Sequence, residues 1–250
     1  MNCERTETLL GAEAMNRLRA MHVALYGLGG VGGWCAEALL RSGVGKLTII
    51  DDDLVQESNL NRQCCATAKT VGRKKCEAMA ERLKEIDPEA KIVAIGERFV
   101  PGMAAVECDA IVDAIDSVDC KCALILAAQA QGIPVFSSLG AAKRLDPTKV
   151  ELKRFKKVEG DALARAMRQR FRKIESDRVE KGQLGSDAKG HQETLKDFIC
   201  AVSGESPVEC EGLGSMMPVT AAFGLALASA VVGYGRSLAS RSAYNEGDAI

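Results

Sequence analysis

The fold is decided by Val23-Ala-Leu-Tyr-Gly-Leu-Gly-Gly-Val-Gly32, an apolar run followed by a glycine-rich turn. The apolar part, 23–26, predicts a short buried strand, and a helical pattern follows the turn over 34–41. The turn has the spacing Gly27-x-Gly29-x-x-Gly32. Glycines at this spacing allow a tight turn and let a phosphate approach the backbone at a helix N-terminus. The stretch therefore predicts a nucleotide-binding unit of strand, turn and helix.

Apolar runs and helical patterns continue to alternate outward from this unit. Buried strands are predicted at 47–50, 92–95, 110–113 and 134–136, and helices at 13–20, 72–86 and 121–131. Strands that alternate with helices form a parallel sheet with helices on both faces. The first part of the chain therefore predicts a doubly wound, Rossmann-like α/β fold.

The pattern changes after residue 140. Strands are predicted at 150–153 and 198–202, and Asp161 is placed to cap a helix that ends near residue 174. Residues 175–196 are polar and contain glycines, which predicts a mobile loop. Residues 218–234 are nearly uncharged, but they are fewer than the roughly 20 residues of a membrane span. We expect a buried helix there, over 219–232, with peripheral membrane contact as the alternative.

The composition is that of an ordinary globular protein, with 47% hydrophobic and 27% charged residues. A net charge of −1 argues against a uniformly basic protein that binds polyanions by charge alone. The segment 143–173, however, carries twelve lysines and arginines against four acidic residues, which favours an anionic partner at that surface. The ten cysteines form no CxxC pair, which argues against a structural zinc site and favours a reducing cytoplasm.

Polar residues beyond the glycine turn indicate which nucleotide it would hold. Asp51 ends the second predicted strand 19 residues past Gly32, where a carboxylate can bond a ribose hydroxyl. The turn and Asp51 by themselves favour NAD. The chain continues, however, with Ser58-Asn-Leu-Asn-Arg-Gln63, Val71-Gly-Arg-Lys-Lys75 and Asp113-Ala-Ile-Asp-Ser117.

These three segments bring an arginine, a lysine and an aspartate to the expected position of a triphosphate. Cations can neutralise phosphate charge, and a carboxylate can hold Mg²⁺. A hydride-transfer enzyme needs no such cluster. Adenylation needs it, because its catalysis consists of positioning and charge stabilisation at the α-phosphate. The sequence therefore predicts ATP and Mg²⁺ rather than NAD.

The same segments resemble the E1-like family that includes the MoeB, ThiF and HesA activators. The flanking segments 5–11, 42–45, 145–148 and 161–165 resemble its tRNA threonylcarbamoyladenosine dehydratase branch. The CxxC zinc pairs usual in the MoeB and ThiF branch are absent here, which favours the dehydratases. The resemblance implies one ATP-binding domain over 1–250, with a nucleotide-binding core at 1–140. Residues 141–250 would form a substrate, crossover and dimer part with an antiparallel extension of the sheet.

The resemblance also implies a role for each matching residue. The expected ATP-binding residues are Gly27, Gly29, Gly30, Gly32, Asp51, Asp53, Asn59, Arg62, Lys75, Asp116 and Ser117. Arg62, Lys75, Asp116 and Arg5 are expected to be catalytic, with Asp116 also holding Mg²⁺. Arg5 matches an arginine that enters the partner subunit's site, which implies a homodimer. Asp113 has two interpretations, since it could orient the loop or touch the metal.

The implied reaction is ATP-dependent dehydration of N6-threonylcarbamoyladenosine in tRNA, in which the carboxylate is activated and the carbamoyl group closes a ring. Arg165, Arg168 and Arg172 in the basic segment are candidates for tRNA contact, with a solvated helix face as the alternative. A sulfur-relay or cysteine desulfurase protein is a further expected partner, and the expected location is the cytoplasm.

Other functions stay open at this point. One is E1-like adenylation of a ubiquitin-like sulfur-carrier protein, and another is an NAD-binding oxidoreductase or a nucleotide-binding scaffold without turnover. The attacked phosphate, α or γ, is also open. Cys210 sits where E1-like proteins carry a thioester cysteine, although an incidental thiol is the simpler interpretation. Residues 182–196 have no assigned function.

Overall fold

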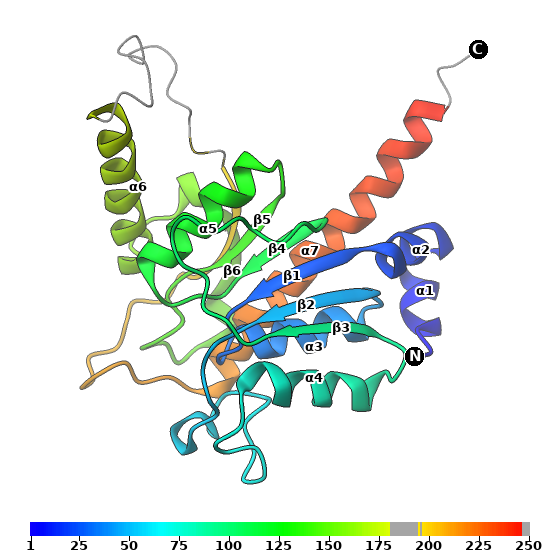
Figure 1. Cartoon of the computed structure of the whole chain (residues 1–250), viewed down its shortest axis with the longest axis horizontal. Helices are drawn as coiled ribbons and strands as arrows, with labels where there is room; N and C mark the ends of the chain where they lie inside the picture. Colours follow the sequence, from blue (N-terminus) through cyan, green and yellow to red (C-terminus); the bar gives the residue numbers. More distant parts are fainter. Residues whose placement is uncertain (181–194, 196, 247–250) are drawn as a thin grey trace.

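The protein folds around one sheet, described here from a computed structural model that covers residues 1–180, 195 and 197–246 (Figure 1). The sheet has seven strands in the order β3-β2-β1-β4-β5-β7-β6. The strands are β1 His22–Tyr26, β2 Lys46–Ile50, β3 Lys91–Ile95, β4 Ala110–Asp113, β5 Val135–Ser138, β6 Val150–Arg154 and β7 Ile199–Ser203.

Neighbouring strands run parallel except at one edge of the sheet. β6 pairs antiparallel with β7, with Val150 opposite Ser203 and Arg154 opposite Ile199. The pairs from β3 to β7 are parallel, and in the centre Tyr26 lies between Ile50 and Asp113. The predicted doubly wound fold with a C-terminal antiparallel extension is confirmed.

Helices cover both faces of the sheet (Figure 1). They are α1 Glu4–Leu10, α2 Ala12–Ala20, α3 Gly32–Arg41, α4 Lys75–Ile86, α5 Val118–Ala130, α6 Ala162–Glu180 and α7 Met217–Glu246. Short 3-10 turns add Glu57–Asn59, Pro147–Lys149 and Phe155–Lys157.

Alternation along the strands divides the core into two layers. Val23 and Leu25 of β1 pack with α3, α4 and α7, whereas Ala24 and Tyr26 face α5 and α6. Successive strand side chains point to opposite faces, so a strand that is apolar throughout must be covered on both sides. This explains why the sequence around the glycine turn reads as one continuous apolar run.

The structure differs from the predicted elements in several places, including the start of α5 at Val118 rather than 121. α1 was not predicted, and α4 begins at Lys75 rather than 72 because Gly72 has a φ of +87° that a helix does not accept. α6 continues to Glu180, so residues 175–180 are helical and not a loop. The rest of the predicted loop, including most of 182–196, lies outside the described residues. α7 is much longer than the predicted 219–232.

α7 is the one helix in the described residues that is long and apolar enough to cross a membrane, by length and composition alone. Its window Met217–Ser237 is 44% buried within the protein. Val219, Phe223, Leu227 and Val231 are fully buried against α3 and the sheet. Spaced three or four residues apart, they form one packed face, and the prediction of a buried core helix is confirmed for that face.

Candidate active site

A cleft of about 440 Å³ lies where the central strands end and their following loops begin. It is lined by segments that follow β1, β2, β3 and β4 and by the start of α4. In open α/β sheets, ligands bind in the crevice outside the carboxyl ends of the strands. Ten of the eleven predicted nucleotide-binding residues line this cleft, namely Gly27, Gly29, Gly30, Asp51, Asp53, Asn59, Arg62, Lys75, Asp116 and Ser117.

The glycines of the turn serve two different purposes. Gly27 has a φ of +89°, and a Cβ there would lie 2.6 Å from the Ala114 carbonyl oxygen. A Cβ at Gly32, which does not line the cleft, would lie 1.8 Å from the Gly27 oxygen. The fold itself requires these two glycines. At Gly29 the nearest atom would be Gln63 Nε2 at 3.9 Å, so the protein has room for a side chain there. Gly29 therefore fits close approach of a phosphate to the backbone.

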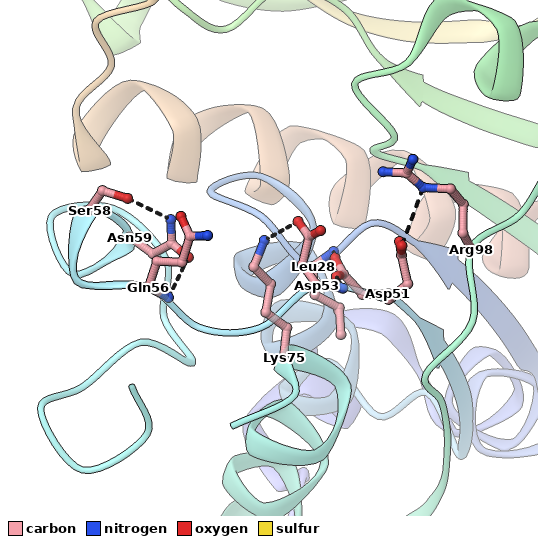
Figure 2. Close-up of polar contacts among 9 residues, drawn as sticks. Leu28, Asp51, Asp53, Gln56, Ser58, Asn59, Lys75 and Arg98 are labelled. Carbon is pink, nitrogen blue, oxygen red and sulfur yellow. Dashed lines mark hydrogen bonds and ion pairs between the residues drawn. The ribbon is translucent and has the colours of Figure 1, made fainter. Parts of the chain in front are cut away.

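Asp51 fixes the glycine turn to the end of β2. Its carboxylate accepts hydrogen bonds from the backbone N–H of Leu28 at 2.6 Å and of Asp53 at 2.9 Å (Figure 2). Burial raises the pKa of Asp51, and these hydrogen bonds and the nearby Lys75 oppose that rise. The turn is thus held in place by the residue predicted to bond a ribose.

Cations lie along the β2 and β3 side of the cleft. Lys75 Nζ donates to Asp53 Oδ2 at 2.7 Å, with a buried lysine and a carboxylate that is 57% exposed (Figure 2). Arg98, which follows β3, pairs with Asp52 Oδ2 at 3.3 Å. Arg98 was not predicted. Its position directly after the third strand could have revealed it, because β3 ends at the same sheet edge as β2.

Asn59 and Arg62 belong to a compact turn beside the glycine loop. Asn59 Oδ1 accepts the Gln56 N–H at 3.0 Å and closes a capping box (Figure 2). Arg62 Nη1 donates to the Ser58 carbonyl at 2.8 Å and to Asn61 Oδ1 at 2.9 Å. A guanidinium has five N–H donors, so Arg62 has donors left to present to an anion in the cleft.

The other wall of the cleft rests on a buried ion pair. Lys121 Nζ lies 2.7 Å from Asp113 Oδ2, and Ser137 Oγ donates to the same oxygen at 2.7 Å. Asp113 Oδ1 accepts the Ile115 N–H at 3.2 Å, at the start of the loop that carries Asp116. All three side chains are buried. Of the two interpretations of Asp113, orientation of the loop is the one this geometry favours.

Asp116 differs from the other carboxylates at this edge. It is exposed, and Asp51, Asp52 and Asp53 are already engaged by backbone N–H groups, Arg98 and Lys75. The oxygens of Asp51, Asp52 and Asp53 lie within 4.8 Å of one another, but their partners compete with a cation. An exposed carboxylate at the cleft is the hard oxygen donor that Mg²⁺ prefers, so Asp116 fits the predicted metal better.

Known proteins are similar to this chain in both sequence and fold. The ThiF family model matches residues 4–234. The tRNA threonylcarbamoyladenosine dehydratase of Escherichia coli (strain K12) is 36% identical over 90% of this chain and 89% of its own length. The chain belongs to the ThiF family. The Bacillus subtilis (strain 168) enzyme of the same name is 36% identical over 68% of each chain.

Solved structures place this ThiF-family chain beside the same enzymes. The E. coli tRNA N6-threonylcarbamoyladenosine dehydratase in complex with ATP matches with a TM-score of 0.83 and 34% identity, covering 95% of this chain and 94% of its own. Its complex with AMP matches equally well. The family resemblance expected from the sequence motifs is confirmed.

Two groups of predicted residues lie away from the cleft of this ThiF-family chain. Arg5 is exposed on α1, at the amino end of the strands and so opposite the glycine turn (Figure 1). On α6, Arg168 donates to the carbonyls of Phe155 at 2.9 Å and Val158 at 2.6 Å and stacks on the Phe155 ring. Arg165 and Arg172 are exposed. Arg168 therefore has a structural task, and the other two remain available to a partner.

The cysteines of the ThiF-family chain are all free thiols, and most are buried. Burial raises the pKa of Cys64 and of Cys122 to about 12, which keeps both protonated. Cys120 lines the cleft, and Cys210 is exposed. Cys64, Cys65, Cys120 and Cys122 are all buried near the site, which fits a packing role.

Proposed function

We propose that this chain catalyses the ATP-dependent dehydration of N6-threonylcarbamoyladenosine in tRNA. The observation that carries the proposal is the cleft itself. It places the glycine turn, Lys75, Arg62 and an exposed Asp116 around one space, in a chain that matches the dehydratases over nearly its whole length. The cations that line this space suit a polyphosphate, whereas a nicotinamide would need no such cluster.

The chemistry proposed for this cleft is activation of a carboxylate. The threonyl carboxylate attacks the α-phosphate of ATP, forming a mixed anhydride and releasing pyrophosphate. The carbamoyl group then attacks the activated carbonyl and expels AMP, so the nucleoside loses one water overall. Lys75 and Arg62 stabilise the charge that develops on the phosphates, and the glycine turn positions the phosphates. Asp51 keeps the turn in place, and its carboxylate also accepts a hydrogen bond from a ribose hydroxyl.

Asp116 is the proposed ligand for Mg²⁺. When bound, Mg²⁺ would supply additional positive charge beside the phosphates. The buried Asp113 and Lys121 hold the loop on which Asp116 sits, and its carboxylate lines the cleft without a competing partner among the described residues. Ser117, at the N-cap of α5, completes this side.

We also propose that the active unit is a homodimer. Arg5 lies on α1, away from the cleft of its own chain, so the catalytic role that the family resemblance implies for it would be in the partner subunit's site. In this division, residues 1–140 form the nucleotide-binding core and 141–250 form the substrate, crossover and dimer part. The exposed Arg165 and Arg172 on α6 are the proposed tRNA contacts, since phosphate contacts dominate nucleic-acid affinity.

The cytoplasm is the proposed location, because the free thiols need a reducing compartment. A sulfur-relay or cysteine desulfurase protein stays a proposed partner that rests on the family resemblance alone.

The deciding experiment is nucleoside mass analysis of tRNA after incubation with the protein and ATP. Loss of one water from threonylcarbamoyladenosine is expected, and none without ATP or with Arg62→Ala. Pyrophosphate release identifies attack at the α-phosphate, whereas phosphate release identifies the γ-phosphate. Unchanged tRNA together with ATP–pyrophosphate exchange on a sulfur-carrier protein would replace this proposal with the E1-like alternative.

A further inference from the structure

Three neighbouring strands, β1, β2 and β3, end in order along one side of the cleft. The glycine turn follows β1, Asp51 follows β2, and Arg98 lies three residues after the end of β3. Ile50, the last residue of β2, pairs in parallel register with Tyr26 of β1 and with Ile95 of β3. Neighbouring strands lie about 4.8 Å apart, so the end of β3 is about 10 Å from the end of β1.

This order of strand ends matches the order of the parts of a nucleotide. The proposed mechanism places the phosphates at the glycine turn and the ribose at Asp51. The base leaves the ribose from the carbon opposite the one that leads to the phosphates, so it continues away from the turn, on the β3 side. Figure 2 shows Asn59 and Arg98 at opposite ends of a row, with Lys75 and Asp51 between them. Arg98 therefore lies at the end of the cleft that the base would occupy.

The lining at the β3 end of the cleft suits a flat aromatic group. Ile50 and Phe99 both line the cleft and are otherwise buried, and the Tyr26 ring packs edge-on against the Phe99 ring. The side chain of Arg98 lines the cleft too and is 62% exposed. Its guanidinium pairs with Asp52 Oδ2 at 3.3 Å, an exposed ion pair of the kind that contributes little to stability. The fold thus makes little demand on Arg98, which is accessible to a ligand.

We propose that Arg98 is a nucleotide-binding residue whose guanidinium stacks on the adenine base of ATP. A guanidinium is planar and stacks flat on aromatic faces, whereas a lysine ammonium is a compact point charge. The phosphates have Lys75 and Arg62 in the proposed mechanism, so the cation at the β3 end is left for another part of the nucleotide. This inference rests on the proposed function, from which it takes ATP as the ligand.

The test measures equilibrium binding of ATP and of inorganic triphosphate, which lacks the base and the ribose, by calorimetry without tRNA. A salt concentration of about 0.15 M screens exposed charges that are more than about 8 Å apart. Arg98→Met is expected to weaken ATP binding about threefold to thirtyfold and to leave triphosphate binding unchanged. Arg98→Lys, which keeps the charge without the flat face, is expected to bind ATP with an affinity between those of Arg98→Met and wild type.

Two control variants separate a contact with the base from a structural role. Arg19→Met on α2 removes a similarly exposed arginine, paired with Glu7 at 2.8 Å, and should bind both ligands like wild type. Asp52→Asn breaks the ion pair but leaves the guanidinium in place, so it should bind ATP at least as tightly as wild type. If Asp52→Asn loses as much ATP affinity as Arg98→Met, the ion pair matters rather than a stacked base, and the assignment is overturned.

The remaining outcomes distinguish this inference from the dehydration proposal. Equal weakening of ATP and triphosphate binding by Arg98→Met would place Arg98 at the phosphates and overturn its assignment to the base. Unchanged ATP binding would overturn the inference and leave the dehydration proposal standing. A wild-type protein that binds no ATP would overturn both.

Steady-state kinetics of tRNA dehydration give a second readout. A contact with the base is the same in the ground state and the transition state, so Arg98→Met should raise the KM for ATP and keep kcat within about twofold. A fall in kcat with an unchanged KM would show that Arg98 acts on the reacting groups and not on the base.

Discussion

Two aspartate–lysine pairs lie at the carboxyl ends of β2 and β4, the strands on either side of β1, and they differ in their exposure to solvent. Asp53 with Lys75 follows β2, and Asp113 with Lys121 connects the end of β4 with α5. The two ion pairs have the same distance, 2.7 Å. Asp53 is 57% exposed in the cleft, whereas Asp113 is fully buried and also bonded to Ser137.

The two pairs differ in their surroundings and not in their ion-pair distance, so the surroundings distinguish the proposed ligand-binding pair from the structural one. In the proposed mechanism Lys75 exchanges its carboxylate for a phosphate, which the 57% exposure of Asp53 allows. Lys121 cannot, because releasing Asp113 would leave two charges buried without partners. The buried pair supports the loop of Asp116, and the exposed pair faces the space that this loop encloses.

Breaking the buried pair should have the largest effect. Lys121→Met leaves Asp113 charged and unpaired in the core, and we expect the free energy of unfolding to fall by about 3–5 kcal/mol. Urea denaturation measures the change. Adding Asp113→Asn should recover part of the loss, since the amide is neutral and its oxygen can still accept from Ile115. Equal stability of Lys121→Met and wild type would show that the pair does not support the loop.

Breaking the exposed pair on the lysine side should affect activity instead. Lys75→Met keeps the aliphatic part of the side chain, so we expect stability to change by less than about 1 kcal/mol. The rate of tRNA dehydration under single-turnover conditions should fall by about 10²–10³, the cost of losing one stabilising group in a transition state. A rate within a few-fold of wild type would remove Lys75 from the proposed mechanism.

Glu37 provides a case between the two pairs. Burial would raise the pKa of Glu37, but hydrogen bonds from Arg41 at 2.8 Å and Arg82 at 2.7 Å outweigh it and lower that pKa. A lowered pKa stabilises the fold above the usual glutamate value of about 4.3, and this stability is lost as the pH falls through the folded-state pKa. Glu37→Gln should therefore cost about 1–2 kcal/mol at pH 7.

The pH dependence of that variant supplies its own control. The melting temperatures of wild type and Glu37→Gln should converge as the pH falls below the lowered folded-state pKa of Glu37, where the glutamate is protonated in both states. A constant difference at every pH would show that packing, and not charge, stabilises this position.

The smallest effect is expected for Asp53→Asn. Asp53 is mostly exposed, and the asparagine oxygen can still accept from Lys75, so the free energy of unfolding should change by about 0.5 kcal/mol or less. Chemical denaturation beside Lys121→Met makes the comparison direct. A loss as large as that of Lys121→Met would mean that exposure does not distinguish the two pairs.

The sequence predicted the fold where burial leaves a repeating pattern. The strands around Gly27–Gly32 are apolar throughout, because helices cover both faces of the sheet. α1 was missed because none of its residues is buried, so the sequence shows no apolar helical face there. The end of α6 was missed for the same reason, since 175–180 are almost entirely polar and the helix continues without a pattern.

The site was predictable where its residues follow a strand in the chain. Asp51 and Asp116 were found from motifs at such positions, and Lys75 from the motif that opens α4; the structure gathers the three into one cleft. The partnership of Asp113, Lys121 and Ser137 was not predicted, because it joins β4, α5 and β5 and depends on packing between them.

α7 has two glycines, Gly224 and Gly235, at which another helix or loop packs too closely for a side chain. A Cβ at Gly224 would lie 2.5 Å from the Val31 carbonyl, and one at Gly235 would lie 2.9 Å from Leu18 on α2. The two are eleven residues apart, which is close to three turns, so they lie on the same side of the helix. Because both glycines lie on one side of the helix, one residue inserted between them would rotate Gly235 by about 100° and disrupt the packing of α2 against α7. The number of residues between Gly224 and Gly235 is therefore constrained by the helical repeat, and insertions in α7 should be tolerated only after Gly235.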